Sequence, residues 1–215
     1  MTKELKKRII TSIVLVAIVL SCLFTSNFLW LLLLIFVSLI CWFEFINLNR
    51  KIWKDKNLII LITFLSFLFL LLFLYTAYKI KAEEGIEAII FILLVCIFSD
   101  VGGYTVGKNI GGKKLTKISP NKTISGSIGS FLFSLFPIFI LSIFGRDYLN
   151  LDFILFSFFI SLACQLGDLL ISYFKRLAKV KDTGKILPGH GGMLDRIDGI
   201  IFALPVAVLI GSKFV

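Results

Sequence analysis

The sequence predicts an all-α fold, a polytopic bundle of transmembrane helices with about seven spans and a cytoplasmic amino terminus. First, 58% of the 215 residues are hydrophobic and the mean hydropathy is +0.99, too apolar for a soluble chain. Second, the apolar runs repeatedly approach the roughly 20 residues that a helix needs to cross a bilayer. Third, Lys and Arg concentrate in alternate connections. Repeated long apolar runs favour helices over a β-barrel.

Seven apolar segments follow one another along the chain. Lys3, Lys6, Lys7 and Arg8 precede the first, as in a signal peptide, but no A-x-A cleavage site follows. We therefore expect a retained first helix. The expected spans are residues 9–24, 28–48 and 58–78, a fourth span that ends near residue 106, and then residues 124–144, 153–171 and 199–211.

Loop charges set the expected orientation. The amino terminus and the second, fourth and sixth connections hold 4, 4, 5 and 6 basic residues. The opposite side holds only Lys79, Lys81, Arg146 and Lys213. Because cytoplasmic loops carry most Lys and Arg, the carboxyl terminus is expected outside. The net charge of +10 is accordingly interpreted as loop bias rather than as a nucleic-acid footprint.

The chain shows no repeat, soluble domain or low-complexity segment. A single membrane domain over residues 1–215 is therefore predicted. Residues 1–80 are expected to form scaffold helices. Residues 86–215 are expected to carry the catalytic helices and cytoplasmic loops.

The stretch from Ser172 to Asp198 is densely polar and holds the only histidine. It is expected to face water, because central charges in a span are costly. It combines cations suited to phosphate, carboxylates suited to a divalent metal and glycines that let a ligand approach the backbone. This inventory indicates a nucleotide-phosphate site. The residues are Lys175, Arg176, Lys181 and Arg196; Asp195 and Asp198; and Gly189, Gly191 and Gly192.

Carboxylates from three helices are expected at one membrane face. The fourth and sixth spans both run inward, which places Asp100 and Asp168 at the cytoplasmic side. Asp195 and Asp198 open the last span there, and share one face if residues 194–199 are helical. Four carboxylates without a Cys cluster or a His pair favour Mg²⁺ over zinc, and a second cation is a further candidate cofactor.

Glu44 lies in the second span without a basic partner in that span. The basic connection at residues 49–57 follows it closely. A structural ion pair with that connection is the favoured interpretation.

Ser119, Lys122 and Thr123 form a second candidate phosphate contact just before the fifth span. Free N–H groups and the helix dipole favour an anion at a helix amino terminus. The pattern GxxxxGK[ST] is absent, so this loop is not a P-loop.

The motifs resemble those of the phosphatidate cytidylyltransferases, or CDP-diacylglycerol synthases. From Ser172 to Asp198 the chain reads S-x-x-K-R-x4-K-D-x-G-x2-L-P-G-H-G-G-x2-D-R-x-D, like the family signature. The segments S-P-x-K-T-x-x-G from Ser119 and D-x-x-G-Y from Asp100 also agree, as does the Gly-Asp pair ending at Asp168. The similarity extends from about residue 100 to the end. Gly199 stands where the family pattern has Ser, and the chain is shorter than typical members.

The resemblance implies that the phosphate of phosphatidic acid attacks the α-phosphorus of CTP, giving CDP-diacylglycerol and pyrophosphate. An anionic phosphate needs no strong base, so metal ions and fixed cations would supply most of the catalysis. The implied metal ligands are Asp168, Asp195, Asp198 and Asp100. The implied catalytic residues are Asp168, Lys175, Arg176, Asp195, Arg196 and Asp198. The implied substrate contacts are Asp100, Ser119, Lys122, Thr123, Ser172, Lys181, His190, Gly191 and Gly192.

Two alternatives stay open at the level of sequence. A CTP-dependent polyprenol or phytol kinase would release CDP rather than pyrophosphate. An ion-coupled transporter would account for Asp100 and Asp168 but not for the basic, Gly-rich stretch.

The expected location is a multi-pass protein of the bacterial inner membrane with its active site on the cytoplasmic face. The expected partners are CTP, phosphatidic acid and membrane lipid, without nucleic acid. A second copy of the chain, forming a homodimer, is a further candidate partner.

Overall fold

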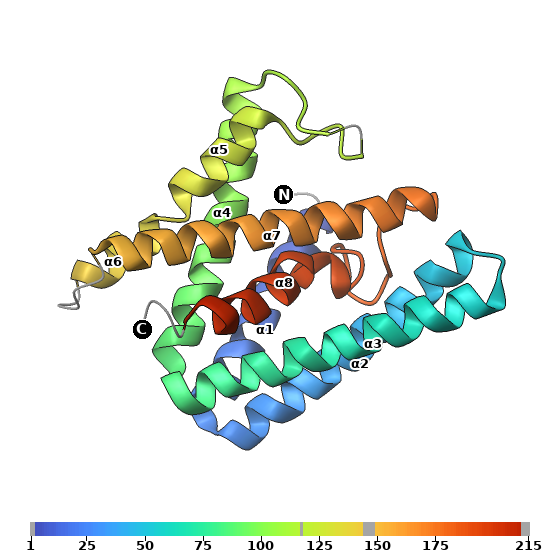
Figure 1. The fold of residues 1–215 in the computed structure, drawn as a ribbon, viewed down its shortest axis with the longest axis horizontal. Helices are drawn as coiled ribbons and strands as arrows, with labels where there is room; N and C mark the ends of the chain where they lie inside the picture. The colour runs from blue at the N-terminus through green and yellow to red at the C-terminus, as the bar shows by residue number, and fades with distance from the viewer. Residues whose placement is uncertain (1–2, 117, 144–148, 212–215) are drawn as a thin grey trace. The chain divides into compact units, whose positions relative to one another are not determined.

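A computed structural model describes residues 3–116, 118–143 and 149–211, and confirms the all-α prediction (Figure 1). The loop cations Lys117 and Lys213 and the predicted connection residues Arg146 and Asp147 lie outside the described residues. The elements are α1 Lys3–Thr25, α2 Asn27–Ile52, α3 Lys56–Lys79, the π-helical turn η1 Ile80–Glu84, α4 Ile86–Ile110, α5 Ile124–Phe133, α6 Phe136–Ile143, α7 Leu151–Leu177 and α8 Leu194–Gly211.

Six segments of the described chain are long and apolar enough to cross a membrane, which supports a multi-pass membrane protein. The predicted seventh span forms the larger part of α8, which is not among these six. The orientation of the amino terminus stays a prediction. The six segments are Leu5–Thr25, Asn27–Ile52, Lys56–Glu84, Ile86–Ile110, Ile124–Ile143 and Leu151–Leu177.

Several helix boundaries differ from the sequence-based expectation. The helix α4 continues to Ile110, and α7 continues to Leu177. Ser172, Lys175 and Arg176 therefore stand on the last turns of a helix rather than in a loop. Basic side chains are favourable there, because the carboxyl end of a helix carries partial negative charge. The predicted fifth span is divided into α5 and α6.

The chain forms two compact units. Unit 1 consists of residues 1–86 and 174–197, and unit 2 consists of residues 87–173 and 198–215. Both α7 and α8 contribute residues to each unit. The prediction of a single membrane domain is not tested by this division and stays a prediction.

In unit 1, α2 and α3 form an antiparallel hairpin (Figure 1). Near the turn, the Asn49 amide donates to the Ile59 carbonyl at 3.1 Å and to the Thr63 hydroxyl at 3.0 Å. At the other end, the Trp30 indole N–H donates to the Ala77 carbonyl at 3.2 Å. Polar side chains thus join two otherwise apolar helices, as is usual where hydrophobic contrast with lipid is weak.

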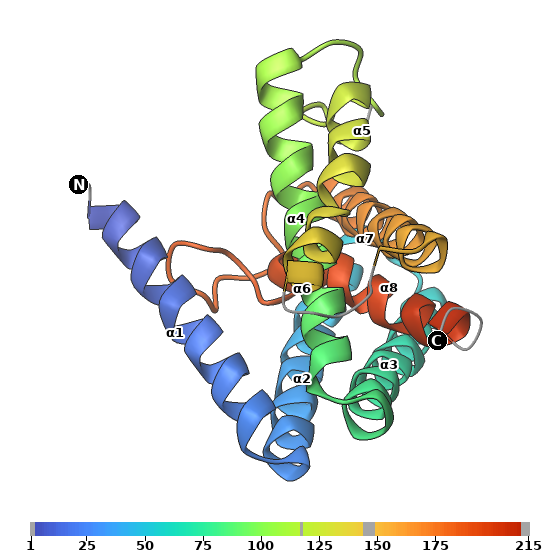
Figure 2. The ribbon, with the colours of Figure 1, turned by 90° about the vertical axis from the view of Figure 1, so that its left-hand side faces the viewer.

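A buried lysine holds the turn between α1 and α2, which Figure 2 shows at one end of both helices. The Lys81 ammonium, on η1, donates to the carbonyls of Ser26 at 2.9 Å and Cys22 at 3.4 Å. Lys81 is only 6% exposed. A cation at the carboxyl end of α1 is favourable for the helix dipole. Lys81 therefore has a structural task in unit 1.

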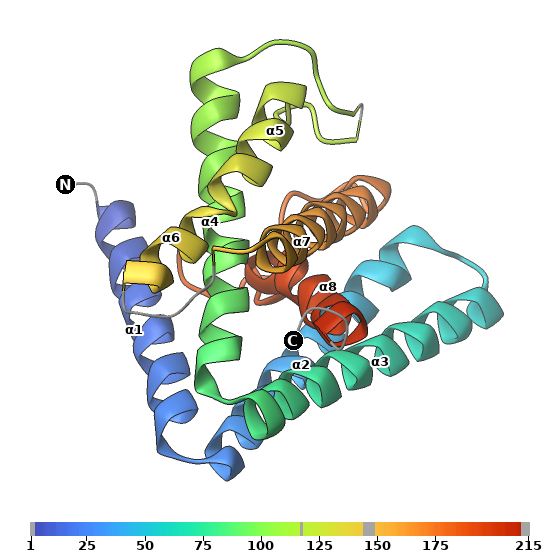
Figure 3. The same cartoon turned by 60° about the vertical axis from the view of Figure 1, so that its left-hand side comes forward.

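In unit 2, glycines let α4 and α5 pack closely (Figure 3). A Cβ on Gly102 would collide with the Gly129 carbonyl and lie 2.5 Å from the Phe133 Cβ. A Cβ on Gly126 would lie 2.8 Å from the Gly103 carbonyl. Small residues at such crossings bring two backbones together, as in membrane helix pairs generally.

A second glycine contact joins α7 and α8 within unit 2. A Cβ on Gly167 would lie 2.5 Å from the Asp198 carbonyl and 2.6 Å from the Phe202 ring. A Cβ on Gly199 would collide with the Cys164 sulfur and lie 3.1 Å from the Cys164 carbonyl. Gly199 departs from the family pattern, and its lack of a side chain leaves space for the neighbouring Cys164.

Replacing Gly199 with Ser should lower the melting temperature of the detergent-solubilised protein, since overpacking a filled contact typically costs about 1–3 kcal/mol. The matched control is Gly211→Ser on the same helix, where a Cβ would meet nothing nearer than Phe156 at 3.9 Å. Adding Cys164→Ala to Gly199→Ser should restore part of the loss. Equal melting temperatures for the two single variants would contradict this packing.

Candidate functional site

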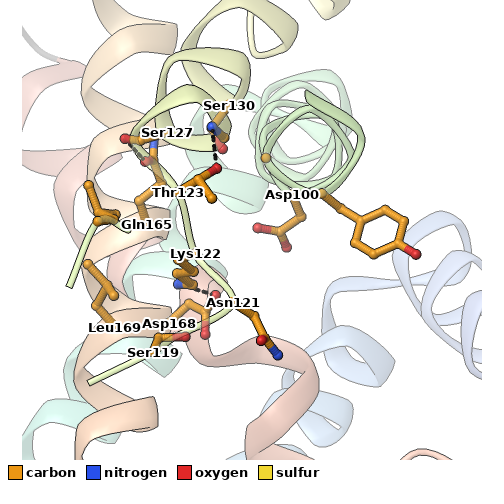
Figure 4. Close-up of a pocket in the computed structure, with 14 residues that line it drawn as sticks. Asp100, Ser119, Asn121, Lys122, Thr123, Ser127, Ser130, Gln165, Asp168 and Leu169 are labelled. Carbon is orange, nitrogen blue, oxygen red and sulfur yellow. Dashed lines mark hydrogen bonds and ion pairs between the residues drawn. The ribbon is translucent and has the colours of Figure 1, made fainter. Parts of the chain in front are cut away.

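Unit 2 contains a cavity of about 370 Å³ between α4, α5, α7 and the connection that precedes α5, and charged and polar residues form part of its lining. Figure 4 shows the Asp100 carboxylate pointing from α4 towards the side of the cavity where Lys122 and Asp168 lie. Five of the predicted site residues line this cavity, namely Asp100, Ser119, Lys122, Thr123 and Asp168.

The connection before α5 is folded by its own backbone. The Lys122 N–H donates to the Ser119 carbonyl at 3.0 Å, which closes a four-residue turn with Pro120 at its second position. Proline is favoured there because its fixed φ suits the turn. The Thr123 hydroxyl then accepts the Gly126 N–H at 3.0 Å and caps α5. These residues therefore precede a helix amino terminus as predicted, and their phosphate contacts stay a prediction.

Two residues of the cavity lining, Lys122 and Asp168, form an ion pair. The Lys122 ammonium lies 2.5 Å from Asp168 Oδ2, and the Ser172 hydroxyl donates to Asp168 Oδ1 at 3.2 Å. Asp100 lines the same cavity, so two carboxylates and one ammonium form part of its lining. This arrangement can bind either a metal cation through its oxygens or a phosphate through its lysine.

In unit 1, Asp195 is held on both of its oxygens. The Lys175 ammonium donates to Oδ1 at 2.7 Å. Oδ2 accepts the Thr183 N–H at 2.7 Å and the Gly192 N–H at 3.1 Å, and the Thr183 hydroxyl oxygen lies 3.0 Å from it. Burial alone would raise the pKa of Asp195, but these donors outweigh it and hold the pKa below its usual value. Asp195 is therefore a charged, fixed carboxylate.

Glu44 belongs to the same network, which sequence reasoning missed. This buried carboxylate accepts the backbone N–H groups of Met193 at 3.0 Å and Leu194 at 2.9 Å. It also accepts the Thr183 hydroxyl at 2.9 Å. The predicted ion pair with residues 49–57 is replaced by these three donors, because the amino end of α8 offers N–H groups to an anion. The acidic side chain of Glu44 within a span indicated a buried partner. Sequence spacing could not identify that partner, because it lies far away along the chain.

Two glycines make room for this network. A Cβ on Gly184 would collide with the Glu44 carboxylate. A Cβ on Gly192 would collide with the Thr183 hydroxyl and lie 2.5 Å from Glu44 Oε2. The missing side chain of Gly192 therefore leaves room for Glu44 and Thr183, and its contact with a ligand stays a prediction.

Unit 1 has a cavity of its own, of about 570 Å³, at the stretch that carries the signature. Arg196 donates to the His190 carbonyl from Nε at 3.2 Å and from Nη2 at 2.7 Å. Arg176 is exposed on the last turn of α7 and lines neither this cavity nor that of unit 2. The predicted site residues that line the cavity of unit 1 are Lys181, His190, Gly191 and Arg196.

The predicted metal ligands fall in both units. Asp195 belongs to unit 1, and Asp100, Asp168 and Asp198 belong to unit 2. Asp195 and Asp198 do share the start of one helix, α8, as predicted. Within the described residues, no group of three or more His, Cys, Asp or Glu side chains is arranged to hold a metal ion. The Mg²⁺ site and the second cation stay predictions.

The fold and these two cavities define a multi-pass membrane protein with clustered cations and carboxylates. The profile of the cytidylyltransferase family matches residues 6–82 and 60–214. The chain belongs to this family. The resemblance noted in the sequence is thereby confirmed.

Individual relatives agree. A phosphatidate cytidylyltransferase of Helicobacter pylori is 44% identical over 141 residues, which is 63% of this chain and 52% of the relative. Enzymes of the same name from Staphylococcus epidermidis and Staphylococcus aureus are 43% and 45% identical over 126 residues, 58% of this chain and 48% of each relative. The chain thus spans about half the length of the curated relatives it matches.

Replacing Glu44 should destabilise unit 1. Glu44→Ala leaves the N–H groups of Met193 and Leu194 buried without their acceptor, at a cost of about 1–3 kcal/mol for each group. Glu44→Gln keeps one oxygen acceptor and should lose less. Melting temperatures in detergent would measure both, with the exposed Glu83→Gln as the control. We expect the melting temperature to be lowest for Glu44→Ala, intermediate for Glu44→Gln and highest for wild type. Equal melting temperatures for the three proteins would contradict the network.

The stability contributed by Asp195 should depend on pH. Because its folded pKa lies below the ordinary value of 3.8, the contribution is complete above that value and is lost as the pH falls through the folded pKa. The difference in unfolding free energy between wild type and Asp195→Asn should therefore shrink as the pH falls from about 5 to about 2. This window extends about 1–2 pH units to either side of the ordinary carboxyl pKa. Chemical denaturation at each pH would measure the gap, with exposed Asp152→Asn as control. A gap that is constant with pH would refute the assignment.

Proposed function

We propose that the protein is an integral-membrane cytidylyltransferase that converts CTP and phosphatidic acid to CDP-diacylglycerol and pyrophosphate. One observation carries the proposal: Asp100, Lys122 and Asp168 line one cavity beside the capped amino end of α5. The names of the relatives support the same reaction.

The chemistry asks for positioning rather than for a strong base. A phosphate monoester is already anionic near neutral pH, so the oxygen of phosphatidic acid can attack the α-phosphorus of CTP directly. The bond to the leaving pyrophosphate breaks as the new P–O bond forms. Lys122, the Ser119 and Thr123 hydroxyls and the α5 amino end would hold phosphate oxygens.

Mg²⁺ fits the donors of unit 2. Asp100, Asp168, Asn121 and Gln165 line the cavity and offer the oxygen ligands that Mg²⁺ prefers. Asp100 and Asp168 would hold the ion, which when bound would neutralise phosphate charge and stabilise the leaving pyrophosphate. Asp198 is a candidate ligand of the same ion or of a second cation. Asp195, engaged by Lys175, Thr183 and Gly192, fits an orienting role better.

The setting completes the proposal. The enzyme would lie in the bacterial inner membrane with its site on the cytoplasmic face, where soluble CTP meets lipid head groups. Alternate loops rich in Lys and Arg support this orientation. A homodimer is part of the proposal, and the mass of the detergent-solubilised particle would test it.

The reaction can be tested with purified protein, labelled CTP, Mg²⁺ and phosphatidic acid in mixed micelles. Label should enter the lipid phase and pyrophosphate should appear. Asp168→Asn and Lys122→Ala should each reduce turnover by about 100-fold or more, the effect of removing a charge-stabilising group. Chelation of Mg²⁺ should abolish turnover.

The control is Asp152→Asn, which changes an exposed carboxylate on the same helix, α7. It should keep near-normal activity. Release of CDP with phosphorylation of an added lipid alcohol would identify a kinase instead. Near-normal turnover in both Asp168→Asn and Lys122→Ala would contradict the proposed site.

A further inference from the structure

We propose that Arg8, at the start of α1, completes a phosphate-binding site in the cavity of unit 1. The inference rests on the proposed function for the identity of the phosphate, and it adds a residue outside the signature. The other cationic side chains that line this cavity are Lys181, Lys185 and Arg196.

Charge in this cavity favours an anion. Among the described residues, its lining holds these four cationic side chains and one carboxylate, Asp182. Its volume of about 570 Å³ far exceeds the roughly 30 Å³ share of one water molecule in the liquid. There is room for a phosphate group together with its remaining hydration.

Direct contacts fix the position of α1 against this cavity. The Thr11 hydroxyl, which donates to the Lys7 carbonyl at 2.8 Å, also lies 3.2 Å from the Pro188 carbonyl oxygen, and the Ser12 hydroxyl lies 3.2 Å from His190 Nε2. Gly189 has a positive φ of 77°, and a Cβ there would lie 3.0 Å from Arg8 Cγ. Because Gly189 has no side chain, the aliphatic part of the Arg8 side chain can pack beside it.

Guanidinium chemistry suits the site. Arg196 uses Nε and Nη2 on the His190 carbonyl, which fixes the plane of its guanidinium at the cavity. Arg8 brings a second guanidinium from another element. Planar guanidinium groups bind phosphate oxygens through paired N–H donors, so two of them with two lysines match a phosphate better than lysines alone.

The depth of Arg8 points to a phosphate at the membrane boundary. Arg8 lies in the first turns of the candidate span Leu5–Thr25, and the next residues Ile9, Ile10 and Ile13 are exposed apolar side chains. An arginine at that depth keeps its charge in water while its stem covers apolar surface. The phosphate of a lipid head group or the phosphates of a nucleotide could meet it there. The shared ligand is a phosphate oxyanion, and the experiment separates the two sources.

The test uses the full chain in mixed micelles and compares Arg8→Gln with Lys7→Gln. The control removes the same charge from the neighbouring residue, which does not line the cavity. One arm varies CTP at saturating phosphatidic acid, and the other varies phosphatidic acid at saturating CTP. Arg8→Gln should raise KM about tenfold in one arm, with kcat within about twofold, as expected when uniform binding energy is lost. Lys7→Gln should leave both KM values within about twofold.

The arm that responds identifies the source: phosphatidic acid for a lipid phosphate, CTP for a nucleotide. Arg8→Gln behaving like Lys7→Gln in both arms would overturn the site. Lys185→Gln removes another cavity cation from an exposed loop position and gives the same test if Arg8→Gln folds poorly.

A binding readout without turnover keeps this proposal separate from the proposed reaction. CTP or phosphatidic acid that binds the folded protein should raise its melting temperature. A shift present in wild type and Lys7→Gln but reduced in Arg8→Gln supports the site even if no cytidylyl transfer is found. An equal shift in all three proteins overturns the site even if transfer occurs.

Discussion

The carboxylate of Glu44 is the constraint on which the signature stretch of unit 1 depends. A carboxylate buried in a helical span is costly unless it is paired or fully hydrogen-bonded. Here the compensation comes from two N–H groups at the start of α8 and from the Thr183 hydroxyl. That hydroxyl also lies 3.0 Å from Asp195, whose other oxygen binds Lys175. One buried anion in α2 thereby fixes the start of α8 and the orientation of a signature aspartate.

Glycine plays the corresponding part in unit 2. Close contacts at Gly102 and Gly129 bring α4 against α5, and so place Asp100 and the connection before α5 around one cavity. Gly167 and Gly199 do the same for α7 and α8. Charged side chains set the loops of unit 1, whereas the absence of side chains sets the helix spacing of unit 2. Both devices serve to hold polar groups in a mostly apolar chain.

Much of this could be predicted from sequence because the signals were local. Apolar length predicted the spans, and the turn and cap at Ser119 and Thr123 follow from their immediate neighbours. The end of α7 at Leu177 lies beyond the predicted span, because Lys175 and Arg176 suit the last turn of a helix as well as a loop. The partners of Glu44 and the place of Arg8 were missed because they join residues more than a hundred positions apart. No spacing rule reaches across that distance without a fold.

Two of the predicted metal ligands, Asp195 and Asp168, differ in how readily they could change partners. The Asp195 side chain is 6% exposed, and its oxygens accept from an ammonium and two N–H groups, with the Thr183 hydroxyl 3.0 Å away. A metal ion would have to displace several of these donors at once. The Asp168 side chain is 33% exposed and is bound by Lys122 and by the Ser172 hydroxyl. Exchanging one lysine for a divalent cation, at a site open to water, costs far less desolvation. The same ionic chemistry therefore fixes structure at Asp195 and favours exchange of ligands at Asp168.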